Sequence, residues 1–233
     1  MEQVFPQRPT DTPRPLTLLL DAVDQMILAS ELHYERLLGA ALRNGFLTDS
    51  ARDGTKSDDT RRELKRGQVE IVADLGGFIG TIHRLRRLMD RFPGDRDTRP
   101  LKKEFIASVR DLEVARHHLE HLEKAILDPL SNSEGAFGAI SWWRIVDERT
   151  IVLTFFFPGT ATKGAEVLNR RPTSMRGAVD HVWARVAGQN LNVTETYFAV
   201  VKLEEGLRRW GASQAEQGWP SLATRRERNK PEG

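Results

Sequence analysis

The sequence predicts a mainly α-helical fold, an antiparallel helical bundle with an added β-hairpin and two C-terminal helices. Apolar residues recur every three, four or seven positions in three long segments of the first 130 residues, which is the spacing of a buried helix face. Two short runs rich in β-branched and aromatic residues follow, separated by three polar residues, a pattern typical of a hairpin. Helices therefore dominate, and the hairpin is an addition to them.

Two long helices are expected first. One spans residues 15–44 and is predicted to end before Gly45, because glycine commonly follows the last turn of a helix. Residues 48–60 are small and polar and predict an exposed loop. The second helix spans residues 60–91. Its four glycines indicate either close helix packing or a bend.

The third helix is predicted from the signals at its two ends. It starts at Thr98 and Pro100, a residue pair suited to a helix cap and first turn. It runs as one continuous helix to Asp128, which precedes a proline.

The C-terminal half is predicted to hold the hairpin and two shorter helices. The hairpin strands are residues 139–146 and 150–157, and their apolar side chains on both faces indicate burial between helices or an exposed partner surface. Helices are expected over 173–188, after Pro-Thr-Ser, and over 194–210, although residues 193–201 also suit a strand.

These elements are expected to form one domain over residues 15–212. It would consist of a bundle at 15–130, the hairpin at 139–157 and the C-terminal helices at 173–211. The proline-rich residues 1–14 are expected to be flexible, and the polar residues 213–233 disordered.

Composition narrows the functional classes only slightly. The 233 residues are 39% hydrophobic and 29% charged, and no apolar run approaches the roughly 18 residues that span a bilayer, so we expect a soluble protein with no membrane partner. The chain has no cysteine, which excludes disulfides and thiolate metal ligands and fits the cytoplasm.

The net charge of +2 indicates no general affinity for polyanions, so any such site must come from a local cluster. Basic side chains do cluster at both ends of the second helix, where they could follow a phosphate backbone or form a solvated helix face. They are Arg61, Arg62, Lys65 and Arg66 at its start and Arg84, Arg86, Arg87 and Arg91 at its end.

The segment Arg-His-His-Leu-Glu-His at 116–121 interrupts the apolar face of the third helix. Arg116 and Glu120 fall on the same face as its buried residues. A charge on such a face needs a partner or an opening to solvent. The two residues are one turn apart and could pair with each other, or the face could line a cleft or a subunit interface.

This segment resembles the signature of the HEPN superfamily, which is an Arg, a polar residue, three variable residues and a His. Arg116, His117 and His121 fit that pattern. The resemblance covers about residues 15–130 and places the motif on a late helix of a small helical bundle, as expected here.

The resemblance implies a metal-independent endoribonuclease of the toxin or defence type, which needs no cofactor and acts on RNA as a homodimer. Arg116 would bind phosphate, and His121 would be the general acid or base. His117, Glu120 and Arg110 would support catalysis or contact the substrate. Residues five apart on a helix diverge by about 140°, so the cleft would need a second protomer. A toxin of this kind would have an antitoxin or another protein partner.

Other interpretations of the same residues remain open. One is a non-catalytic helical module that contacts a nucleotide, a nucleic acid or a protein partner, or dimerises, through the motif helix. Another is zinc binding, because His117 and His121 also match the H-x-x-E-H pattern of inverted zinc peptidases, although nothing in the sequence marks a third ligand. Glu123 stands where some family toxins carry a modified Tyr, so that kind of regulation is not supported.

Overall fold

The computed structural model describes residues 4–5, 12, 14–52, 57–93, 96–120, 138–158, 169–217 and 219. The mainly helical class is confirmed, together with a small antiparallel sheet. Among the described residues, no helix combines the length and apolar character needed to cross a membrane. The elements are α1 (Arg14–Arg52), α2 (Asp58–Arg91), α3 (Thr98–Ser108), α4 (Leu112–Glu120), β1 (Ala139–Asp147), β2 (Thr150–Phe156), β3 (Val179–Val186), β4 (Gln189–Asn192) and α7 (Val193–Gln217).

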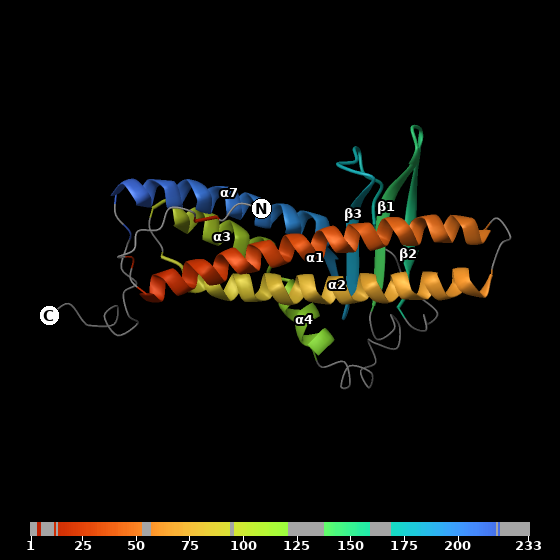
Figure 1. The fold of residues 1–233 in the computed structure, drawn as a ribbon, viewed down its shortest axis with the longest axis horizontal. Helices are drawn as coiled ribbons and strands as arrows, with labels where there is room; N and C mark the ends of the chain where they lie inside the picture. Colours follow the sequence, from red (N-terminus) through yellow and green to blue (C-terminus); the bar gives the residue numbers. More distant parts are fainter. Residues whose placement is uncertain are drawn as a thin grey trace.

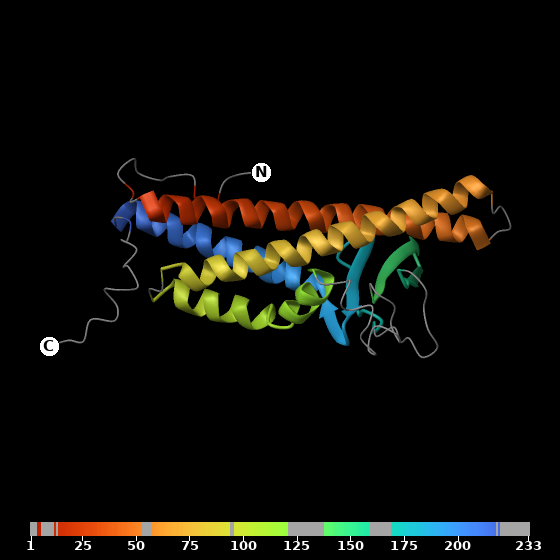
Figure 2. The same ribbon diagram turned by 90° about the horizontal axis from the view of Figure 1, so that it is seen from below.

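The two longest helices form the backbone of the molecule. At 1.5 Å per residue, α1 and α2 are about 58 Å and about 51 Å long, and they lie side by side, antiparallel (Figure 1). The helices α3 and α7 lie along one half of this pair, and the sheet packs against the other half (Figure 2). A single cluster of buried apolar side chains joins the helices and the sheet.

The prediction that the first helix ends before Gly45 is wrong, because α1 continues to Arg52. Gly45 instead makes room for the side chain of Arg144 on β1: a Cβ at residue 45 would lie 2.6 Å from Arg144 Cδ. Residues 48–52 of the expected loop are therefore helical. The next helix starts where expected, with the hydroxyl of Ser57 accepting a hydrogen bond from the Thr60 N–H at 3.1 Å.

The four strands are antiparallel, in the order β2-β1-β3-β4. The β1–β2 hairpin is confirmed, and its tip extends away from the helices (Figure 1). Its apolar side chains differ in burial: Trp142 is fully buried, as the first interpretation expected, whereas Phe155 is 51% exposed, and a partner surface there stays a prediction.

The helix predicted over 173–188 is wrong, because residues 179–186 form β3. Val182, Ala184 and Val186 alternate with more exposed residues, and this period of two buries one face of a strand. The helix predicted over 194–210 is confirmed as α7, which settles residues 193–201 as helical. It extends to Gln217, so the disorder expected from residue 213 is wrong over 213–217. Its first turn is capped by Asn192, whose Oδ1 accepts the Glu195 N–H at 3.0 Å.

Tyr34 ties three elements together near the centre of the molecule. Its ring stacks on Tyr197 of α7 at 4.0 Å, and its hydroxyl donates to Thr194 Oγ1 at 3.1 Å. The same Thr194 oxygen accepts the Val182 N–H of β3 at 2.9 Å. Burial raises the pKa of Tyr34 to about 12, so its phenol stays protonated at neutral pH.

Two glycines of α1 allow a test of the Gly45–Arg144 packing. Gly45→Ala should lower the free energy of unfolding by about 1–3 kcal/mol, because the added methyl group collides with a buried side chain. Gly39→Ala meets only an ordinary contact, Arg43 Nη1 at 3.5 Å, and should raise it by up to about 1 kcal/mol through helix propensity. Urea denaturation measures both, and equal effects would contradict the packing.

Candidate functional site

The described part of the motif, residues 116–120, lies on a helix separate from α3. The predicted continuous helix over 100–128 is wrong within the described residues, because residues 109–111 form a turn that interrupts the helix between α3 and α4. Phe105 before the break, Val109 at its start and Leu112 and Ala115 after it are all buried. The two helices pack on different neighbours, since α3 packs mainly on α7 and α4 packs on α2. One straight helix could not contact both.

Arg116 joins α4 to α2. Its Nη1 lies 2.6 Å from Nε2 of His83 on α2, and its Nη2 donates to Oε2 of Glu120 one turn further along α4. Arg116 is 29% exposed, so its guanidinium sits at the edge of the core. The ion pair expected from the sequence is thus confirmed. The contact with His83 was not expected.

His83 is held as a hydrogen-bond acceptor. Its ring is largely buried, and Nε2 faces a guanidinium that can only donate. Burial, and after it the positive charge of Arg116, lower the pKa of His83 below its ordinary value of 6.5. A neutral imidazole beside Arg116 is the result at neutral pH.

A second ion pair fixes the same two helices. Arg86 Nη1 on α2 lies 2.9 Å from Oε2 of Glu113, near the start of α4. With the Arg116–His83 contact, it holds the short α4 on α2 at two points about one turn apart.

The structure brings together only some of the predicted site residues. Arg116 and Glu120 are in contact, whereas His117 is exposed on α4 and Arg110 is exposed in the break before it. His121 lies outside the described residues. His83 is not among the residues that the sequence singled out. The available signal was a histidine one turn after Ile79, on the buried side of the second helix.

The two basic clusters of α2 differ in their surroundings. At its start, Arg61, Arg62 and Arg66 each lie within 4.0 Å of a carboxylate on the same helix. Near its end, Arg86 is paired with Glu113. By contrast, Arg84, Arg87 and Arg91 are exposed and form no ion pair within the described part of the chain.

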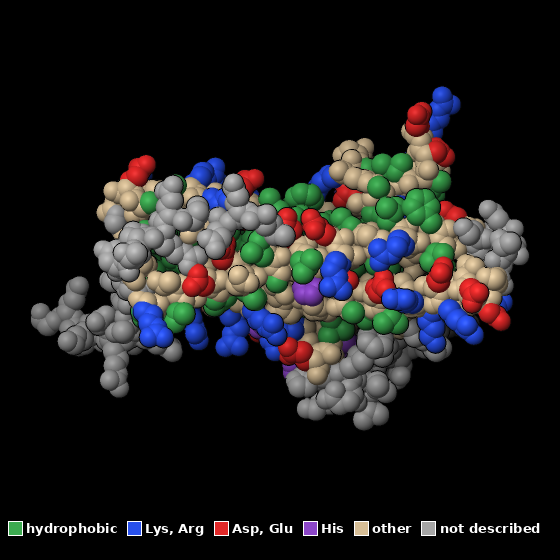
Figure 3. Space-filling view, viewed as in Figure 1, with side chains coloured by type: hydrophobic (Ala, Val, Ile, Leu, Met, Phe, Trp, Pro, Cys, Tyr) green, Lys and Arg blue, Asp and Glu red, His purple; other side chains and the backbone are tan. Residues whose placement is uncertain are grey.

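These three arginines recur every three or four residues and so share one side of α2. Figure 3 shows Lys and Arg side chains along the edge of the molecule that α2 forms. We refer to Arg84, Arg87 and Arg91 as the α2 arginine row. It begins next to His83 in the sequence and is an open cationic surface beside the Arg116 site.

Metal binding by the motif finds no support in the described residues, where no three His, Asp or Glu side chains are grouped to hold an ion. His121, which the zinc interpretation requires, is outside them.

No protein-family model, curated protein or solved structure matches this chain.

The neutral state of His83 predicts a pH dependence of stability. Because the pKa of His83 is lowered in the native state, the unfolded chain binds more protons just below pH 6.5, and the free energy of unfolding should fall as the pH falls through this range. Arg116→Gln should raise the pKa of His83, and Arg116→Lys should keep it lowered, because only the first removes the charge. Ring-proton NMR titration measures this pKa, and a native value above 6.5 would refute the assignment.

Proposed function

We propose that this protein is a metal-independent endoribonuclease of the HEPN type that acts as a homodimer, with Arg116 and His121 at its centre. The observation that supports this best is the state of Arg116. It is partly exposed, oriented by two side chains and close to a row of arginines without carboxylate partners. An oriented guanidinium beside a cationic surface suits the binding of a phosphodiester.

Arg116 keeps donors for a substrate. Guanidinium has five N–H groups, and the bonds to His83 and Glu120 occupy one on each terminal nitrogen. Glu120 is 47% exposed, so its carboxylate can move into solvent when a phosphate arrives. His83 holds the guanidinium in place without adding charge, and we assign it a positioning role.

The proposed reaction needs no metal ion. The ribose 2′-hydroxyl loses its proton to a base and attacks the adjacent phosphorus, while the 5′-oxygen leaves and takes up a proton. The products are a 2′,3′-cyclic phosphate and a 5′-hydroxyl. In this proposal His121 transfers a proton, and Arg116 stabilises the charge that builds up on the phosphate.

The homodimer follows from the spacing of the motif. If α4 continued through residue 121, Arg116 and His121 would diverge by about 140°. The two groups would then converge on one phosphate only from different protomers, with two copies of α4 facing each other.

A non-catalytic binding module is the second candidate. It is favoured by the fact that both terminal nitrogens of Arg116 already have partners in the same chain, as in a structural ion pair. Under this alternative, the α2 arginine row would still bind a polyanion, and substitution of Arg116 would affect stability and leave no activity to lose.

Cleavage of an RNA pool in EDTA tests the nuclease. Arg116→Ala and His121→Ala should each reduce cleavage at least about a hundredfold, as expected for loss of a phosphate ligand or a general acid or base. His118→Ala is the matched control, because the motif leaves that position variable, and it should retain activity. No cleavage by a folded, dimeric wild-type protein would favour the binding module.

RNA binding tests the α2 arginine row. The triple substitution of Arg84, Arg87 and Arg91 by Ala should weaken binding of a single-stranded RNA and reduce the slope of log affinity against log salt by about 2, since each phosphate contact on a single strand contributes about 0.7. The triple Ala variant of Arg61, Arg62 and Arg66 removes the same charge from the same helix and should have a smaller effect, because those arginines are paired. Equal losses would show a non-specific charge effect.

A further inference from the structure

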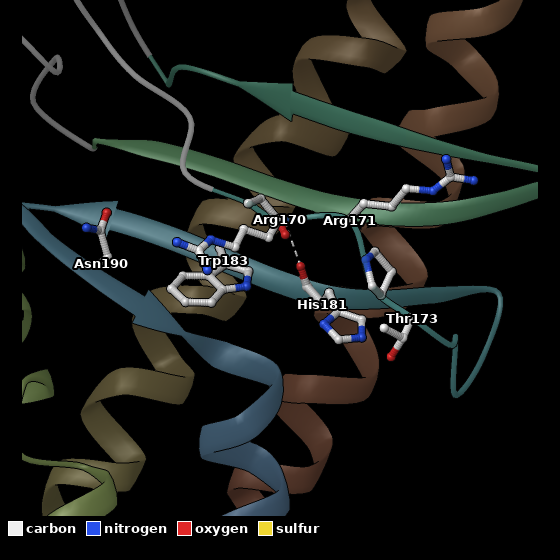
Figure 4. Close-up of a pocket in the computed structure, with 8 residues that line it drawn as sticks. Arg170, Arg171, Thr173, His181, Trp183 and Asn190 are labelled. Atoms are coloured by element: carbon white, nitrogen blue, oxygen red, sulfur yellow. Dashed lines mark hydrogen bonds between the residues drawn. The ribbon is translucent and has the colours of Figure 1, made fainter.

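A cavity of about 810 Å³ lies on the outer face of the sheet, at a distance in sequence from the motif helix. The apolar residues of β3 that alternate inward pack on the helices, whereas the cavity residues project from the opposite side (Figure 4). Its described lining includes Arg170, Arg171, Thr173, His181, Trp183 and Asn190.

One buried side chain holds the wall of the cavity in place. Asn169 is only 9% exposed, and its Nδ2 donates to Ser141 Oγ at 3.1 Å and to the His181 carbonyl at 2.8 Å. Its Oδ1 accepts the indole N–H of Trp143 at 3.1 Å. Arg170 and Arg171 follow this residue directly, so their backbone is anchored to both β1 and β3.

A β-bulge shapes the opposite wall. Ser141 pairs with Trp183 but Trp143 pairs with Asp180, so β3 holds one extra residue between these pairs. His181, within the bulge, has a φ of 52°, a strained left-handed conformation for this residue. The carboxylate of Asp180 supports it by accepting the His181 N–H at 2.7 Å. Bulges commonly redirect side chains beside binding sites, and backbone strain is often concentrated there.

The cavity favours an anion. Arg170 and Arg171 are exposed and form no ion pair within the described part of the chain. No carboxylate belongs to the described lining residues. Arg170 extends toward Trp183, whereas Arg171 points to the other end of the cavity (Figure 4). A single phosphate could therefore contact one of these guanidiniums directly and would be attracted by the charge of the other at longer range.

The same end of the cavity offers an aromatic ring. Trp183 is partly exposed, and neither its ring nor its indole N–H has a partner among the described residues. Asn190 on β4 presents an exposed amide on the same face, since it lies opposite Arg185, two residues from Trp183 on β3. An unpaired indole suits stacking with a flat ring, and an amide suits hydrogen bonding to the edge of that ring.

We propose that this cavity binds a nucleoside monophosphate unit, with its base stacked on Trp183 and its phosphate on Arg170. Asn190 would contact the edge of the base, and Arg171 would add to the positive field. The unit can be a free nucleotide or one nucleotide of an RNA strand, because both present the same base and phosphate. The inference rests on the cavity alone and does not require the proposed nuclease.

Isothermal titration calorimetry tests the proposal with 5′-AMP and with an adenine pentaribonucleotide. The titrations use the full chain carrying Arg116→Ala and His121→Ala, so that no strand is cleaved and the result is independent of nuclease activity. Saturable binding of AMP would identify a free-nucleotide site, and binding of the pentanucleotide alone would identify a subsite for a strand. Binding of neither ligand at millimolar concentration would overturn the proposal.

Further substitutions in the Arg116→Ala/His121→Ala variant test which residues bind the ligand. Arg170→Ala should weaken binding roughly tenfold through loss of a charge-assisted phosphate contact, and Trp183→Leu should weaken it roughly tenfold through loss of stacking. Trp183→Phe keeps a ring at this position and should restore part of the affinity. Arg149→Ala removes the same charge at the exposed hairpin turn and should leave binding unchanged. Binding that survives both Arg170→Ala and Trp183→Leu in folded protein would place the ligand elsewhere and overturn the assignment.

Discussion

The position of the sheet depends on one buried cation. Arg144 on β1 is 2% exposed, and its guanidinium pairs with Asp49 near the end of α1 and donates from Nε to Thr154 on β2 at 3.2 Å. Desolvating a guanidinium is unfavourable, so the charge stays inside only while these partners remain in place. Gly45 is the complementary feature of α1, because any larger residue there would occupy the space of the Arg144 side chain. The part of α1 after Gly45 and the position of the sheet therefore depend on each other, because Arg144 packs on Gly45 and pairs with Asp49.

Polar contacts of an arginine also hold the motif helix, α4, in place. The nine described residues of α4 are too few to form a stable helix alone, since isolated helices need about 12–15 residues. Two buried side chains, Leu112 and Ala115, and two polar contacts to α2 hold it in place. The Arg116 guanidinium is therefore part of the structural support of its own helix, as well as the group proposed to bind phosphate. Its substitution must be assessed by stability and activity together.

Sequence periodicity predicted the elements that depend on a single buried face. The helices α1, α2 and α7 and the β1–β2 hairpin were found this way, with errors mainly at the ends. The strand β3 was missed because the Pro-Thr-Ser signal before it is typical of a helix start, whereas it forms a strand by pairing with β1, about 40 residues earlier. The break between α3 and α4 contains no glycine or proline and follows from packing against two neighbours. His83 and the outer-face cavity were missed for a similar reason, since Arg116 is 33 residues from His83 and Asn169 is 28 residues from Ser141.

The outer-face cavity lies near the start of the motif helix. A smaller cavity of about 200 Å³ is also lined by Trp183 and Asn190, and it reaches Asp111 and Leu112 at the start of α4. Arg116 lies one helical turn beyond Leu112. Asp111 and Glu195 line this smaller cavity, with Glu195 paired to Arg176, whereas Arg170 and Arg171 line the larger one, so a phosphate is favoured in the larger cavity. A nucleotide unit on Trp183 would consequently keep its phosphate on the Arg170 side of the ring. This charge separation sets the direction in which a strand could cross the sheet.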